Sequence, residues 1–368
     1  MKLFLSQKSL SVILILVLLL VLQVKGIEKE NALPTFEENE LYAEIQIIQE
    51  NIQSGKSSFR DLEAYFTGLA NEKGAKYAYE VLKVAPLPAN TDLHLLGHVV
   101  GDALYKQEGV DGIAICTHHF RNACSHSIVV GVFLEKGEDA LPKVMQACRQ
   151  APGGSGAYAI CFHGFGHGVL AYTGYDLQKT IEICKKTGTP LYKNREYVEC
   201  VGGSIMEMIG GGFHDRELWK KQREKYLKGN DSLYPCNSDL MPEEPRPMCY
   251  MYITPHLFEV VGANLARLTP EDFAKAFPFC NKIPESEFKN RESCYGGFGK
   301  EFVVIAQDRD IRKIEEMTNA QLKKVYEWCL LADNKNGTTA CILHATNSLY
   351  WGGENDRNTA ISFCDIID

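Results

Sequence analysis

The chain has 368 residues, of which 45% are hydrophobic, and a formal net charge of −8 at pH 7. That hydrophobic share is ordinary for a globular protein. The acidic balance argues against nucleic acid and anionic membrane surfaces as partners, because both require basic patches. The sequence contains no Walker A string, no G-x-S-x-G elbow and no H-E-x-x-H string. Nucleotide binding, serine-hydrolase chemistry and zincin-type proteolysis are therefore not indicated.

The N-terminus has the pattern of a targeting segment. Lys2 and Lys8 precede an apolar run over residues 12–22, and Val24-Lys25-Gly26 follows it. Residues 1–26 are predicted to be a cleaved signal peptide. An uncleaved anchor is the alternative, although the run is shorter than the roughly 20 residues of a comfortable span. The chain is thus expected to be exported (secreted, periplasmic or anchored outside the cytoplasm), with membrane contact only if the segment stays attached.

Residues 27–88 contain no cysteine and differ from the rest of the chain. Amphipathic helical stretches are predicted over 37–53, 58–71 and 74–84, and Pro86-Leu87-Pro88 ends them. Repeat proteins usually require terminal caps. Residues 27–88 are therefore predicted to be a helical cap, and residues 89–368 a Cys-rich repeat domain.

The cysteines of the second segment alternate between two kinds of surroundings. The first kind opens a Gly- or His-rich apolar stretch, at Cys124, Cys161, Cys200, Cys249, Cys294 and Cys341. The second kind closes a short amphipathic stretch, at Cys116, Cys148, Cys184, Cys236, Cys280, Cys329 and Cys364. Such a recurring unit indicates a repeat architecture. We predict an all-α fold of about seven antiparallel α/α hairpins, forming a disulfide-stapled solenoid or α/α toroid.

Two disulfide registers each use twelve cysteines. Pairing within units joins Cys124–Cys148, Cys161–Cys184, Cys200–Cys236, Cys249–Cys280, Cys294–Cys329 and Cys341–Cys364, and leaves Cys116 over. Pairing between units joins each closing cysteine to the next opening one and leaves Cys364 over. The within-unit register is favoured, because Cys116 belongs to the unit in which Asp92 stands where the opening cysteine would be.

Histidines give the most concentrated chemical pattern. His94 and His98 form one H-x-x-G-H string, His163 and His167 form another, and His126 is at the equivalent place in the unit between them. Residues four apart share a helix face, so each pair can offer two ligands to one metal ion. His94, His98, His163 and His167 are the candidate metal ligands, with His126 as a fifth, and zinc or iron as the ion. Two alternatives stay open: a set of core histidines hydrogen-bonded to backbone carbonyls, and an acid–base site without a metal ion.

The positions that correspond to these histidines in the later units are also polar: Glu207, His256, Lys300 and Glu301. Polar groups on apolar inner helices require partners, so these residues are predicted to line a binding face together with the histidines. The leading functional hypothesis is a binding module for a protein or small-molecule ligand. The alternative is a metal-dependent enzyme, either a hydrolase or an oxygenase. The sequence leaves open whether the chain is an enzyme.

Glycines flank the histidine row. Gly97 and Gly166 each precede the second histidine of an H-x-x-G-H string. Glycine costs roughly 1 kcal/mol relative to alanine inside a helix, so close helix packing or close approach of a ligand must offset that cost.

Overall fold

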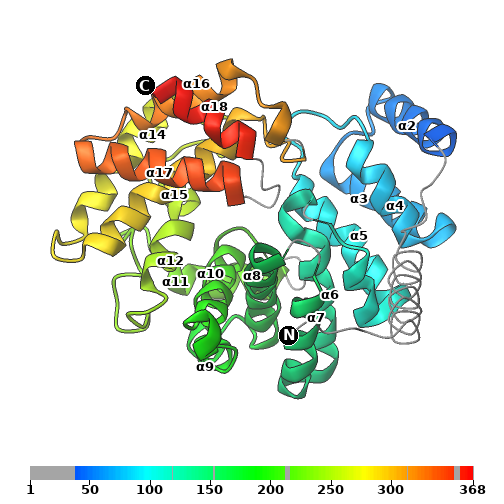
Figure 1. Cartoon of the computed structure of the whole chain (residues 1–368), viewed down its shortest axis with the longest axis horizontal. Coiled ribbons are helices and arrows are strands. Elements are labelled where there is room, and N and C mark those ends of the chain that lie inside the picture. Colours follow the sequence, from blue (N-terminus) through cyan, green and yellow to red (C-terminus); the bar gives the residue numbers. More distant parts are fainter. Residues whose placement is uncertain are drawn as a thin grey trace, which may run out of the picture. The chain divides into compact units, whose positions relative to one another are not determined.

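In the computed structural model, residues 38–117, 119–151, 154–211, 216–312, 314–351 and 357–367 are described, and every regular element among them is a helix (Figure 1). The predicted all-α class is confirmed. The predicted signal peptide and residues 27–37 of the predicted cap lie outside the described residues. None of the described helices is both long enough and apolar enough to cross a membrane.

The helices fall into three groups. The N-terminal group is α2 (Glu38–Gln53), α3 (Phe59–Lys73) and α4 (Ala75–Val84). The inner group holds the opening cysteines and the histidine strings: α5 (Leu93–Glu108), α6 (Ala123–Lys136), α8 (Gly154–Tyr172), α10 (Arg195–Gly210), α12 (Arg246–Tyr252), α13 (Thr254–Val260), α15 (Phe288–Ala306) and α17 (Lys335–Trp351). The outer group is α7 (Leu141–Gln150), α9 (Leu177–Lys185), α11 (Arg216–Tyr226), α14 (Pro270–Ala276), α16 (Asn319–Cys329) and α18 (Arg357–Ile367).

Short 3-10 helices complete the chain. They are η1 (Gly109–Ala114), η2 (His119–Asn122), η3 (Gly137–Ala140), η4 (Pro190–Tyr192), η5 (Phe277–Lys282) and η6 (Ile314–Glu316). Of these, η3 joins the inner helix α6 to the outer helix α7, and η5 lies between the outer helix α14 and the inner helix α15.

The chain divides into two compact units, residues 1–42 and residues 43–368. Within the second unit, the inner helices are neighbours in chain order: α5 packs on α6, α6 on α8, α8 on α10, α10 on α12, α12 on α15, and α15 on α17. Helices α3 and α4 pack against each other and against α5. The predicted boundary at residue 88 stays a prediction.

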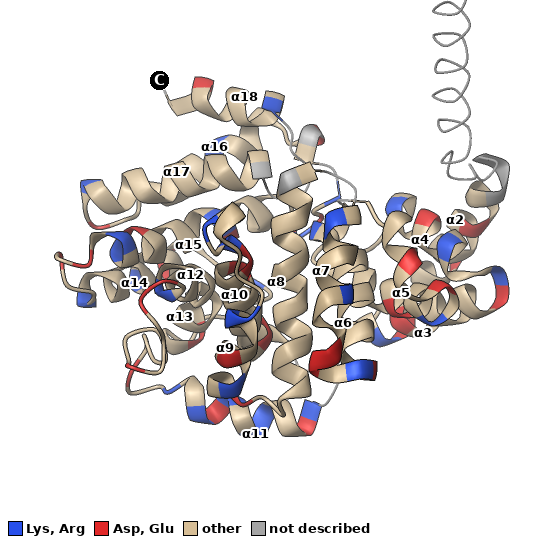
Figure 2. Ribbon diagram, turned by 60° about the horizontal axis from the view of Figure 1, so that its bottom comes forward, with Lys and Arg blue, Asp and Glu red and all other residues tan. Residues whose placement is uncertain are grey.

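The polarity of each helix explains its place. Helix α8 carries no charged side chain (Figure 2), and its residues are mostly buried. Outer helices such as α9 and α16 bury one apolar face and begin at side-chain caps. Helices α14 and α16 begin at capping boxes, Thr269 with Asp272 and Thr318 with Gln321. Each cap satisfies backbone N–H groups that the first helical turn leaves without partners.

Glycines let inner helices meet backbone to backbone. A Cβ atom at Gly166 of α8 would lie 1.9 Å from the carbonyl oxygen of Cys200 in α10. A Cβ at Gly203 of α10 would lie 1.8 Å from the carbonyl oxygen of His163, and one at Gly299 of α15 would lie 2.0 Å from that of Cys341 in α17. Helix packing is therefore the reason that the structure supports for Gly166.

The predicted disulfide register is wrong. The six bridges join each closing cysteine to the next opening one: Cys116–Cys124, Cys148–Cys161, Cys184–Cys200, Cys236–Cys249, Cys280–Cys294 and Cys329–Cys341. Cys364 is free and exposed. Short connections are the physical reason. For example, α7 ends at Gln150 and α8 begins at Gly154, so Cys148 lies beside Cys161, with a Cα–Cα distance of 5.5 Å.

This register predicts the outcome of peptide mapping. Digestion without reduction should give the six linkages named above, and alkylation before reduction should label a single thiol per chain, at Cys364. A Cys161–Cys184 or Cys341–Cys364 peptide would contradict the register. Mass spectrometry of the same digest after reduction is the control for peptide coverage.

Segments far apart in the sequence meet within the second unit. The amide of Asn90 donates to the carbonyl oxygen of Asp308 at 2.8 Å. The guanidinium of Arg312 donates to the carbonyl oxygens of Leu82 and Ala85, at 3.1 and 2.6 Å. These contacts join the segment before α5 to the segment after α15.

Candidate functional site

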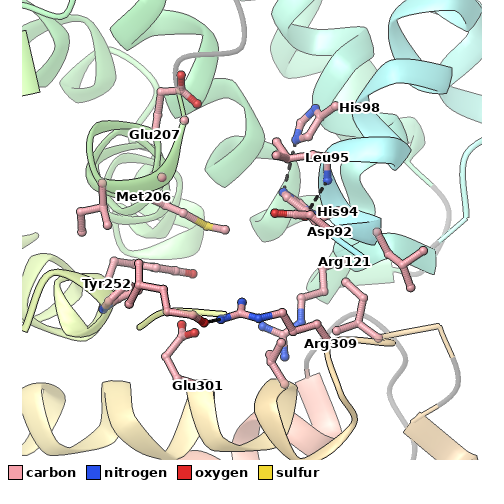
Figure 3. Close-up of a pocket in the computed structure, with 18 of the residues that line it drawn as sticks. Asp92, His94, Leu95, His98, Arg121, Met206, Glu207, Tyr252, Glu301 and Arg309 are labelled. Atoms are coloured by element: carbon pink, nitrogen blue, oxygen red, sulfur yellow. Dashed lines mark hydrogen bonds between the residues drawn. The ribbon is translucent and has the colours of Figure 1, made fainter. Parts of the chain in front are cut away.

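A cavity of about 430 Å³ lies among the inner helices (Figure 3). That volume is within the range of small-molecule sites. Six of the predicted site residues line it: His94, His98, His167, Glu207, Lys300 and Glu301. The other three, His126, His163 and His256, are buried outside its lining.

His94, in the first turn of α5, has a fixed tautomer. Its Nδ1 lies 2.7 Å from the carbonyl oxygen of Phe120. A carbonyl oxygen only accepts, so Nδ1 must carry the proton and Nε2 keeps a lone pair. The carbonyl is positioned by a left-handed run, in which Phe120, Arg121 and Asn122 have φ values of 59°, 52° and 62°. Three consecutive non-glycine residues in this region are strained, and such strain is typical of functional sites.

His98, one turn further along α5, has the same tautomer. Its Nδ1 lies 3.1 Å from Oγ of Ser127, and that hydroxyl donates its only proton to the carbonyl oxygen of His98 at 3.0 Å. Nδ1 of His98 therefore donates, and its Nε2 also keeps a lone pair. The Nε2 atoms of His94 and His98 are 3.2 Å apart. Two lone pairs at this distance repel each other unless they share a proton or a cation.

A shared proton is disfavoured there at neutral pH. Burial lowers the pKa of His94 to about 4, against the favourable effect of the Phe120 carbonyl. Neutral imidazoles are the form that binds metal ions, so the pair is better suited to a metal ion than to a proton.

His167 of α8 is held by a carboxylate. Its Nδ1 donates to Oε2 of Glu207 at 3.0 Å, and both side chains are buried. Its Nε2 is buried and makes no hydrogen bond to the described residues. In metal sites, a ligating histidine usually donates its other N–H to a carboxylate or a carbonyl. His167 and His94 both have this arrangement.

His126 of α6 lies between the two histidine strings. Its side chain is 1% exposed, and neither ring nitrogen has a hydrogen-bond partner among the described residues. Burial, together with the four neighbouring histidines, lowers its pKa well below the ordinary value. Gly164 makes room for the ring, because a Cβ there would lie 2.2 Å from Cδ2 of His126. An unsatisfied buried imidazole is costly, so a ligand for it is expected.

The structure brings His94, His126 and His167 together, with one ring nitrogen of each within 4.8 Å of the others. Three atoms with these separations each lie within about 2.8 Å of a common central point (4.8/√3). Zinc–imidazole bonds are about 2.0–2.1 Å long, so an inward shift of roughly 0.7 Å per ring would form them. The residues fit a first-row transition metal.

His98 is close enough to join this set. The edge of a tetrahedron around a zinc ion with those bond lengths is about 3.3 Å, and the Nε2 atoms of His94 and His98 are 3.2 Å apart. His98 could therefore serve as a fourth ligand.

Two predicted site residues point elsewhere. Nε2 of His163 lies 3.4 Å from Sδ of Met206, and its ring lies 4.7 Å from the ring of Tyr252, centroid to centroid. Nδ1 of His256 lies 3.2 Å from Oε2 of Glu259. His163 therefore borders the cluster without converging on it, and His256 belongs to a separate ion-pair group.

Lys300 and Glu301 form a half-buried ion pair on α15. Nζ of Lys300 lies 2.7 Å from Oε1 of Glu301 and 4.7 Å from the centroid of the Tyr252 ring. Burial lowers the pKa of Lys300. Burial alone would raise the pKa of Glu301, but Lys300 and Arg121 more than compensate, and that pKa is lowered. Glu301 is therefore anionic at neutral pH.

Sequence reasoning missed Arg121, Tyr252 and Arg309, which also line the cavity. The predicted site residues were found by counting a fixed number of residues from each opening cysteine. Such a count finds only positions that recur from one inner helix to the next. Arg121 and Arg309 lie in irregular segments with positive φ, and no feature of the repeat pattern marks them.

The fold and the site define a class: a disulfide-rich, all-helical protein with a buried histidine cluster beside a pocket. Six intramolecular disulfides suggest an oxidising, extracellular environment. No protein-family model, curated protein or solved structure matches the chain.

Proposed function

We propose that this chain is an exported metal-dependent enzyme of the hydrolytic kind, with a zinc ion held by His94, His126 and His167. The main support for the proposal is that ring nitrogens of the half-buried His94 and of the buried His126 and His167 converge. The other ring nitrogens of His94 and His167 are already engaged by a carbonyl and a carboxylate. This arrangement leaves the converging nitrogens unprotonated and fixed in direction.

The donor set favours zinc over iron. Non-haem iron oxygenases use two histidines and one carboxylate, whereas three histidines are typical of catalytic zinc. Among the described residues, the converging set contains only histidines. The carboxylate of Glu207 accepts the hydrogen bond from Nδ1 of His167.

The position of the histidine cluster beside the cavity favours a catalytic role over a purely structural one. Catalytic zinc sites have three protein ligands and one open position, while structural sites are closed. His94 and His167 line the cavity, so the open position would face a bound substrate. Zinc in such a site polarises a substrate carbonyl and lowers the pKa of a coordinated water to about 7. The protein's own part is to orient the imidazoles, through Phe120 and Glu207, and to keep the cluster buried.

A binding module without a metal is the second candidate. The cavity has mainly apolar walls and a few converging polar groups, among them Glu207, Lys300 and Glu301, as ligand-binding pockets have. On this hypothesis the histidines serve only to hold the inner helices together, and His256 belongs to the same inner face.

We further propose that residues 43–368 close into an α/α toroid of hairpin repeats. The ordered packing of the inner helices supports this arrangement, as do the contacts between residues 82–90 and residues 308–312. Residues 1–26 would direct export as a signal peptide.

Metal analysis of protein produced without a His-tag tests the proposal. We expect about one zinc ion per chain, lost in His126→Ala, and an affinity weakened about 10–100-fold in Glu207→Gln because the carboxylate orients His167. His256→Ala is the matched control, since it removes a buried histidine outside the cluster, and it should retain zinc. Metal-free parent protein with unchanged helical content would leave the binding module as the better hypothesis.

The His98→Ala variant distinguishes an open site from a closed one. If three histidines hold the ion, this variant should still bind zinc stoichiometrically. Loss of zinc in His98→Ala would indicate a closed four-histidine site, and the catalytic part of the proposal would then be wrong.

A further inference from the structure

Arg121 lines the cavity without a carboxylate partner. Its Nη2 donates to Oγ of Ser348 at 3.3 Å, and its Nε is buried with no hydrogen-bond partner. It forms no ion pair with any described carboxylate. A partly buried guanidinium that is not neutralised is costly, and the left-handed run that holds it is strained as well. The fold therefore maintains an unfavourable cation at the wall of a pocket.

A second arginine reaches the same part of the cavity. Arg309 has a φ of 64° and donates from Nη2 to the carbonyl oxygen of Leu265 at 2.9 Å. It also lacks an ion pair among the described residues. Figure 3 shows the side chains of Arg121 and Arg309 extending toward each other near Glu301. Each arginine therefore has unused donors that face the pocket.

Neither arginine forms an ion pair with Glu301 or Glu207, although the positive charge of both arginines helps to lower the pKa of Glu301. Glu301 is paired with Lys300, and Glu207 with His167. Asp92 accepts from the amide of Leu95 as the N-cap of α5. The lining also includes Asp102, so its four carboxylates outnumber the three cations, Arg121, Lys300 and Arg309. An anion would therefore be recognised by the unused guanidinium donors and not by an excess of positive charge.

We propose that the cavity binds a small organic anion with an apolar body, and that Arg121 and Arg309 hold its carboxylate or phosphate group. Guanidinium groups recognise both of these oxyanions through paired hydrogen bonds. The remaining walls suit an apolar body, because Met206, Ile209, Phe258, Leu268 and Val304 line them.

The inference deepens the proposed function and rests on it in one respect. If His94 and His167, which line the same cavity, hold a metal ion, an anion anchored on the arginines would lie in the same pocket as that ion. The substrate would then be an amphipathic acid or phosphate monoester with a cleavable bond away from the charged group.

Isothermal titration calorimetry with hexanoate, hexyl phosphate and the neutral analogue hexanamide tests the anion site. We expect at least one of the two anions to bind, with its Kd raised at least about tenfold in Arg121→Gln and in Arg309→Gln. Hexanamide should bind more weakly than that anion, and equally to parent and variants. Whichever anion binds more tightly identifies the oxyanion. Arg149→Gln, an exposed arginine of α7, is the matched control and should leave Kd unchanged.

Two results would overturn the inference: no binding of either anion, or anion binding that is unchanged in both Arg121→Gln and Arg309→Gln. Circular dichroism of each variant checks that it folds, and the two separate arginine variants guard against misfolding of one. Each titration is done first on protein dialysed against EDTA and then with added zinc. Arginine-dependent anion binding without any zinc uptake would refute the metal proposal alone, and zinc uptake without anion binding would refute the anion site alone.

Discussion

Gly166→Ala should lower the free energy of unfolding by about 3 kcal/mol or more, at the upper end of the range for overpacking. The new methyl group would lie 1.9 Å from the carbonyl oxygen of Cys200 and 2.9 Å from the amide nitrogen of Ser204. Both atoms belong to the backbone of α10, so no side-chain rotation can relieve the clash. Helices α8 and α10 would have to separate, against a gain of only about 1 kcal/mol in helix propensity.

Gly68→Ala is the matched control for this variant. Gly68 lies in α3, and a Cβ there would meet no atom within 4 Å. This change should stabilise the protein by up to about 1 kcal/mol, because only helix propensity acts. Denaturant unfolding followed by circular dichroism measures both. A Gly166→Ala protein as stable as the parent would mean that α8 and α10 do not pack at this distance.

The repeat pattern predicted the helices because two independent features of the sequence, the apolar Gly-rich stretches and the capped amphipathic stretches, both indicate helices. Apolar Gly-rich stretches must be inner helices, and the capped amphipathic stretches after them must be outer ones. The disulfide register did not follow from the same pattern, because antiparallel helices place both kinds of cysteine at the same end. The short connections between successive helices determine the disulfide register. Asp92, interpreted as a missing cysteine, is the N-cap of α5 and accepts from the amide of Leu95.

The sequence also indicated which histidines would be neighbours, since equivalent positions of successive inner helices come together. It did not indicate which way each ring turns. His163 faces Met206 because α10 presents a sulfur atom there, and that contact belongs to the packing of two helices. Arg121 and Arg309 depend on left-handed segments that tertiary contacts hold, so local propensity could not reveal them.

Arg312→Met should lower the free energy of unfolding by about 2–4 kcal/mol, because it leaves two backbone carbonyls without donors. Arg312 is 8% exposed. Its Nη1 donates to the carbonyl oxygens of Leu82 and Ala85, at 3.1 and 2.6 Å, and its Nη2 donates to Oδ2 of Asp310 at 2.6 Å. Methionine retains much of the apolar stem but offers no donor, so the contact between residues 82–85 and 310–312 should open.

The Asp310→Asn variant separates the two contributions of this arginine. The Asp310 side chain is 49% exposed, so its ion pair with Arg312 is screened by solvent and should contribute at most about 1 kcal/mol. If the carbonyl contacts dominate, Asp310→Asn should be close to the parent in denaturant unfolding, and Arg312→Met far below it. Hydrogen exchange gives an independent measure: the amide of Asn90, which donates to Asp308, should exchange faster in Arg312→Met alone. Equal stability of Arg312→Met and the parent would show that these distant segments are not joined through this side chain.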